Sequence, residues 1–245
     1  TGLGGKFEVR PPVGPEHVLR LGVDYRRAEG NMDEVNAFSG VRLAGGVNTD
    51  LGFFVEDDWL LGDLILTGGV RLDRSSIRDG YFQTEAAGRT NFPDRAEWVF
   101  SYRLGAMYQA GETVRLRAAT YTGLRQPTLN ELYRPYQIFP ETFLANAELE
   151  LERLEGYEAG IDWLPVPGAK LSLTAFDNQV ENAVANVTIG PNLNQRRNLD
   201  AIDARGLEFA AQYDAGPFSF TGTLAYTDAE VRGTGFAAPL EGNRP

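Results

Sequence analysis

Arginine and tyrosine side chains gather in one region of an otherwise acidic sequence. The set consists of Arg103, Arg115, Arg117, Tyr121, Arg125, Tyr133, Arg134 and Tyr136. The planar guanidinium group forms paired hydrogen bonds with anionic oxygens and stacks on aromatic rings. These residue types therefore predict binding of an anionic, conjugated small molecule.

A second interpretation is that some of these arginines pair with carboxylates of the same protein, such as Asp73, Glu158 and Asp162. It is favoured for Arg115 and Arg117, which lie deep inside a predicted strand. The ligand candidates are the residues nearer the end of that strand and in the connection after it: Arg125, Tyr133, Arg134 and Tyr136.

Other residues offer weaker chemistry. His17 adjoins a predicted turn and is more typical of a solvated histidine than of a catalytic or metal-binding one. The carboxylates of 56–58 and the oxygens of Asn198, Asp200 and Asp203 are more typical of polar strand ends and loops than of a paired-carboxylate or cation site. Nucleophile-elbow, phosphate-loop and dinucleotide motifs are absent. We therefore predict a protein that is not an enzyme, with no catalytic residue, metal site or cofactor.

Composition narrows the protein class. The 245 residues include 23% charged and 42% hydrophobic residues, which is typical of a folded chain. A formal net charge of −11 argues against a nucleic-acid partner, because phosphate contacts require a basic surface. There is no cysteine, and no apolar run reaches the roughly 18 residues of a membrane-spanning helix.

Alternation with period two dominates the chain. The clearest segment is 98–110, where Trp98, Phe100 and Tyr102 alternate with smaller or polar residues. This criterion predicts about ten strands. They cover residues 4–10, 17–27, 51–60, 64–74, 98–110, 114–125, 154–163, 171–178, 205–213 and 218–228. Helical periodicity is confined to a short turn over Thr128–Arg134.

Short and long connections alternate between these strands. Tight turns such as Gly62-Asp63 and Pro165–Gly168 are separated by long connections over 28–50, 75–97, 126–153 and 179–204. Trp59, Trp98 and Trp163 stand near strand ends, as in the aromatic girdles of membrane barrels. The rhythm predicts an all-β fold, an antiparallel up-and-down transmembrane β-barrel with short periplasmic turns and long extracellular loops. A water-soluble all-β fold is the less favoured alternative.

Seven short motifs resemble, in order, those of TonB-dependent outer-membrane receptors. The most specific is Y-T-G-L-R-Q-P-T-L-N-E-L-Y at 121–133, where that family commonly has G-F-R-A-P-T-L-N-E-L-Y; here Leu124 and Gln126 depart from it. The others are F-V-E-D-D-W (54–59), L-T-G-G-V-R-L-D (66–73), N-A-E-L-E-L-E (146–152), L-E-G-Y-E-A-G (154–160), A-R-G-L-E (204–208) and L-A-Y-T-D-A (224–229).

This resemblance implies a protein of the bacterial outer membrane, in contact with lipid, that takes up a scarce nutrient with energy delivered by TonB through a plug domain. A ferric siderophore is the expected small-molecule cargo. Family barrels have about 22 strands, so residues 1–245 are expected to be an internal part of the barrel without the plug. Plug carboxylates are then further partners for Arg103, Arg115, Arg117 and Tyr121. A passive porin-like or structural barrel, and a soluble all-β binding module, remain the alternatives.

Overall fold

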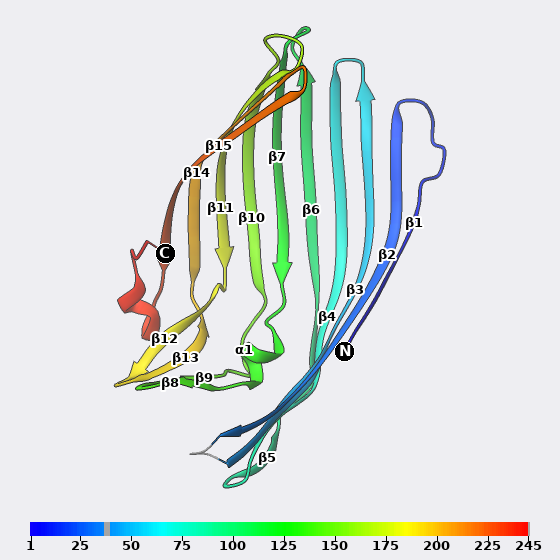
Figure 1. Ribbon diagram of the computed structural model, residues 1–245. Coiled ribbons are helices and arrows are strands. Elements are labelled where there is room, and N and C mark those ends of the chain that lie inside the picture. Colours follow the sequence, from blue (N-terminus) through cyan, green and yellow to red (C-terminus); the bar gives the residue numbers. More distant parts are fainter. Residues whose placement is uncertain (37–39, 245) are drawn as a thin grey trace.

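One large antiparallel sheet makes up most of the molecule. The computed structural model describes residues 1–36 and 40–244, with Asn36 described by its backbone alone. Within these residues the large sheet has the strand order β1-β2-β3-β4-β6-β7-β10-β11-β14-β15, with β5 paired to β4 (Figure 1). Its strands are β1 (Gly2–Val9), β2 (His17–Asn36), β3 (Gly40–Leu61), β4 (Leu64–Thr84), β5 (Gly88–Asn91), β6 (Arg95–Gln109), β7 (Val114–Arg125), β10 (Glu152–Trp163), β11 (Ala169–Glu181), β14 (Ala201–Ala215) and β15 (Phe218–Arg232).

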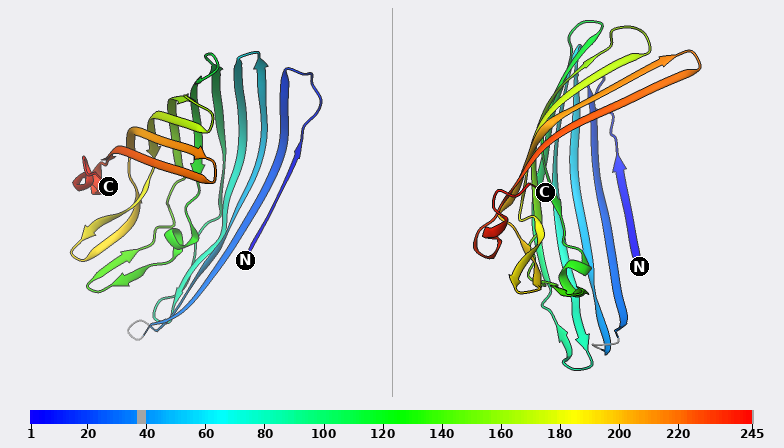
Figure 2. Two further views of the ribbon diagram at one scale, coloured as in Figure 1. Left: turned by 45° about the horizontal axis from the view of Figure 1, so that its top comes forward. Right: turned by 60° about the vertical axis from the view of Figure 1, so that its left-hand side comes forward.

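The ten strands expected from the alternation all lie in this sheet, in chain order, and the up-and-down antiparallel fold is confirmed. The sheet is curved and twisted, as Figure 2 shows. Over the residues described it is open, with β1 and β15 as its outer strands.

Short and long connections lie at opposite ends of the sheet. The turn at Gly62-Asp63 is one of the tight ones, and Gly62 has a φ of 62°, which a residue with a side chain rarely adopts. We call this end, at the top of Figure 1, the short-turn end, and the opposite end the long-loop end. The short turns therefore lie together at one end of the sheet and the long connections at the other, as expected.

Three strands extend far beyond their expected limits. The predicted connections 28–50 and 75–97 are mostly strand, because β2 pairs with β3 as far as Asn36↔Gly40 and β3 pairs with β4 as far as Arg42↔Thr84. Glycine at 30, 45, 46 and 80 conceals the alternation in the sequence, while backbone pairing continues regardless. Residues 37–39 of the first connection lie outside the described residues.

A small second sheet and a short helix occupy the long-loop end. Strands β8 (Tyr136–Ile138), β9 (Glu141–Leu144), β12 (Val184–Gly190) and β13 (Leu193–Asn198) pair in the order β12-β13-β9-β8. Helix α1 (Leu129–Tyr133) confirms the expected helical turn, and a 3-10 helix, η1, covers Gly235–Leu240. None of the described helices has the length and apolar character needed to cross a membrane.

The two faces of the large sheet differ sharply. Large apolar side chains lie on one face, here called the apolar face, and many of them are exposed, among them Ile161 at 40% and Leu224 at 71%. Its cross-strand rows include Phe53–Leu72–Phe100 and Ile161–Leu173–Phe209–Leu224. The opposite, polar face contains buried Asp73 and Asp162, which are 5% and 4% exposed. A water-soluble sheet has the reverse arrangement, so the pattern is that of a sheet with its apolar face in lipid.

The three tryptophans lie on the exposed apolar face, as expected for girdle residues. Trp59 and Trp163 stand near the short-turn end, and Trp98 lies toward the long-loop end. The lipid-facing belt therefore lies between these levels.

Candidate ligand-binding site

The four residues expected to face the lumen share the polar face of the large sheet. Register aligns Arg103 with Tyr121, and residues 107 and 109 with Arg117 and Arg115. Arg103 lies 3.8 Å from Glu56, and Arg115 donates to Gln109 at 3.2 Å. Arg117 lies 3.6 Å from Asp162 and also donates to the Thr174 hydroxyl.

Tyr121 and Arg117 lie flat against the sheet. Each stands directly opposite a glycine of β10, Gly156 and Gly160 respectively. A Cβ added at Gly156 would come within 2.6 Å of the Tyr121 ring, and one at Gly160 within 2.7 Å of the Arg117 guanidinium carbon. The glycines thus allow both large side chains to lie close to the wall and leave the space above them open.

The connection after β7 folds onto the polar face of the extended strands β3 and β4. The Asn48 amide donates to the Pro127 carbonyl at 2.9 Å, and Gln126 donates to the Ser76 carbonyl at 3.1 Å. Helix α1 lies against Gly46, where an added Cβ would come within 3.0 Å of the Tyr133 ring. A side chain at position 46 would crowd the Tyr133 ring, so glycine favours this close approach.

Tyr133, expected as a ligand contact, packs against the wall of the sheet. Its side chain is 3% exposed and belongs to an apolar cluster with Ala44, Ile77, Leu132 and Leu149. Its ring stacks on Phe92 with centroids 5.1 Å apart, and burial raises the pKa of its hydroxyl.

Arg125, at the end of β7, is engaged by two carboxylates. Its guanidinium lies 3.1 Å from a Glu131 oxygen, and its Nη2 donates to Glu152 at 2.7 Å. Burial acts to raise the pKa of Glu131, but hydrogen bonds from the Thr128 amide and from Arg125 outweigh it and hold that pKa below its ordinary value.

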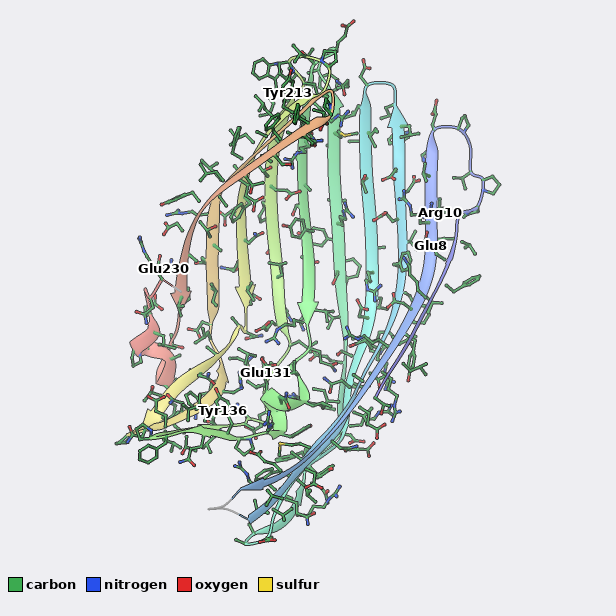
Figure 3. All side chains as sticks on the ribbon, in the orientation of Figure 1. Glu8, Arg10, Glu131, Tyr136, Tyr213 and Glu230 are labelled. Carbon is green, nitrogen blue, oxygen red and sulfur yellow. The ribbon has the colours of Figure 1, made fainter. Side chains whose placement is uncertain are left out.

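Arg134 and Tyr136 remain accessible. The Arg134 side chain is 43% exposed, and its ion pair with Glu34 is long, at 4.0 Å. Tyr136 stacks on Phe143 with ring centroids 4.6 Å apart and planes within 3°. Figure 3 shows Tyr136 and Glu131 toward the long-loop end, far from Tyr213 at the short-turn end.

Three further residues lie around Tyr136 on its face of the small sheet. The Arg196 guanidinium lies 5.8 Å from the Tyr136 ring centroid, and the Asn186 amide donates to the Tyr136 hydroxyl at 3.4 Å. Phe143 lies opposite Tyr136 in register. We define the loop site as Arg134, Tyr136, Phe143, Asn186 and Arg196. The sequence did not single out Phe143, Asn186 and Arg196 as site residues, because they fall in predicted loops and only cross-strand pairing brings them together.

The weaker candidates have ordinary roles. His17 contacts Asp57 at 2.7 Å and stacks on Trp59 at the short-turn end. Arg20 binds both Glu56 and Asp58, and Asp203 accepts from Arg232 at 3.0 Å. Over the part of the chain that the structure describes, no group of three or more histidine or acidic residues has a metal-binding arrangement.

Comparison with known proteins agrees with this arrangement. All of residues 1–245 match the family model described as "TonB dependent receptor-like, beta-barrel". The chain belongs to this family. TonB-dependent receptors are bacterial outer-membrane transporters rather than enzymes, so the expected class and cellular location are confirmed at the level of the family.

Relatives of the TonB-dependent receptor family show both the likeness and its extent. The vitamin B12 transporter BtuB of Vibrio vulnificus is 26% identical over 166 residues, which cover 68% of this chain and 22% of that protein. The copper transporter OprC superimposes with a TM-score of 0.73 at 19% identity, covering 94% of this chain and 38% of that one. The FrpB iron transporter of Neisseria meningitidis superimposes with a TM-score of 0.67 at 17% identity, and the match covers 99% of this chain and 38% of that one. The chain thus spans well under half the length of these proteins.

Proposed function

We propose that this chain forms part of the barrel wall and ligand entrance of a TonB-energised receptor that takes up a ferric siderophore. The observation that supports this cargo is the loop site, where the stacked pair Tyr136–Phe143 adjoins Arg196, and the exposed Arg134 lies two residues before Tyr136 in the chain. Aromatic faces and guanidinium groups together suit an anionic, conjugated metal chelate.

The polar face supplies the second part of the proposal. Arg103 is 65% exposed, although it has Glu56 as a partner. Together with Arg115, Arg117 and Tyr121 it would face a plug domain contributed by another part of the protein, and TonB would act on that plug. The energy for transport would then be supplied by TonB through the plug and not by residues of this chain.

Other cargoes and classes fit less well. His17 is the single histidine, and it contacts Asp57 at the short-turn end, which disfavours haem as the cargo. The exposed apolar face disfavours a soluble binding module. A passive barrel is the remaining alternative. Uptake that depends on TonB would exclude a passive barrel, and uptake without TonB would support it.

The experiment uses the full-length receptor in outer membranes, with iron-55 chelates of catecholate and hydroxamate type and labelled cobalamin as a comparison. We expect uptake of one ferric chelate that is abolished in cells lacking TonB. Replacing Arg134 and Tyr136 together by alanine should weaken its binding by about tenfold or more without lowering the yield of folded barrel.

Arg153→Ala is the matched control, because this arginine is 44% exposed, pairs only with Glu97 among the contacts described, and lies outside the loop site. Unchanged affinity in the double variant would refute the loop site. Uptake that persists without TonB would instead establish the passive alternative.

A further inference from the structure

Arg125 binds two carboxylates from different parts of the chain. Nη1 and Nη2 face Glu131 of α1, while Nε and Nη2 donate to Glu152 at the start of β10. Both carboxylate side chains are only 13% exposed. The Arg125 side chain is itself 43% exposed, but each of its three nitrogens already donates to one or both of these carboxylates.

Each carboxylate in turn holds a different segment of the long-loop end. Glu131 accepts from the Thr128 amide at 2.7 Å and the Thr128 hydroxyl at 2.9 Å, which completes the cap of α1. Glu152 accepts from the Val184 amide at 2.6 Å, at the first residue of β12. One guanidinium therefore joins β7, α1, β10 and β12.

These segments lead directly to the loop site. Arg134 and Tyr136 follow α1 by one and three residues, and Asn186 follows Val184 by two. Arg196 lies 3.9 Å from the same Glu131 carboxylate. The cluster thus links the two halves of the loop site, which come from connections far apart in the sequence.

We propose that Arg125 is a positioning residue, which orders both halves of the loop site through Glu131 and Glu152 and does not itself contact the ligand. The fork of the guanidinium group is essential to this role, because it donates to two carboxylates at once. Lysine keeps the charge but has a single nitrogen that cannot reproduce this geometry. Only the ligand readout of the test below rests on the proposed function.

The test compares hydrogen exchange at the amides of Thr128 and Val184 in the full-length receptor and in its Arg125→Ala and Arg125→Lys variants. We expect exchange at both amides to rise about tenfold or more in Arg125→Ala, and by an intermediate factor in Arg125→Lys. The ladder amides of Ala118 and Ala159, deeper in β7 and β10, should be unchanged. Arg153→Ala is the control, because Arg153 is about as exposed as Arg125 and pairs with one acidic residue, Glu97. This variant should leave the Thr128 and Val184 amides protected.

A ligand measurement separates positioning from contact. Saturating ligand should restore protection at both amides in Arg125→Lys, since binding energy then orders the loop site, and this variant should lose less affinity than Arg125→Ala. Unchanged protection at Thr128 and Val184 in Arg125→Ala would overturn the proposal, as would a loss of affinity while both amides stay protected. The exchange result stands on its own even if the receptor carries a cargo other than a ferric siderophore.

Discussion

Replacing Tyr133 by alanine tests how α1 is held against the wall. The side chain is 3% exposed, stacks on Phe92, and lies over Gly46 and Gly80. Because both positions are glycine, neither has a side chain that could fill the space that truncation leaves. The cost should therefore appear as local opening of residues 126–150 while the large sheet stays intact.

The magnitude follows from the buried area. A tyrosine buries roughly 150–200 Å², which at ~25 cal/mol/Å² corresponds to about 4 kcal/mol. Partial burial in the opened loop reduces this figure to about 3 kcal/mol. At about 1.4 kcal/mol per tenfold change, exchange of the α1 amides should rise about a hundredfold.

The assay is hydrogen exchange of the full-length receptor, followed at the Leu132 and Arg134 amides, which donate to Thr128 and Asn130. Tyr108→Ala is the control, since Tyr108 is 48% exposed at the short-turn end. If Tyr133→Ala lowered ligand affinity while these amides stayed fully protected, the packing role would be refuted and a direct ligand contact established.

Two further predictions concern charge. The pKa of Glu131 is lowered from its ordinary value of 4.5, so its stabilisation of α1 is complete above that value and is lost as pH falls through the folded-state pKa. Hydrogen exchange at the Leu132 amide, corrected for intrinsic rates, should be constant from about pH 7 to about pH 5 and should rise at lower pH. Glu131→Gln should abolish this rise. A constant rate at all pH values in the unsubstituted receptor would contradict the capping role. Leu104, 53% exposed on the apolar face, and Met107 on the polar face lie on the same strand. Leu104→Arg should destabilise the receptor in lipid vesicles by about 2–4 kcal/mol, measured by urea unfolding, and Met107→Arg by much less; equal effects would show that the faces are assigned wrongly.

Prediction from sequence succeeded where a local pattern was sufficient. The row of Trp98, Phe100 and Tyr102 specified a strand and its apolar face, and Thr128–Arg134 specified the helical turn. It failed in the extended parts of β2–β4, where Gly45 and Gly46 interrupt the alternation. The sequence also did not indicate that Tyr133 packs against the wall, because adjacency to Arg134 and Tyr136 says nothing about which side chain does so.

The sequence by itself determined the membrane-type sheet and the family of this protein, because period-two alternation, connection lengths and short motifs are all properties of neighbouring residues. Only the tertiary structure decided which residues meet. Arg125 pairs with Glu152 across 27 positions, and Asn186 reaches Tyr136 across 50. Such contacts depend on strand order and on the way the long connections fold back. The division between ligand contact, packing residue and positioning residue therefore follows from contacts between segments far apart in the chain.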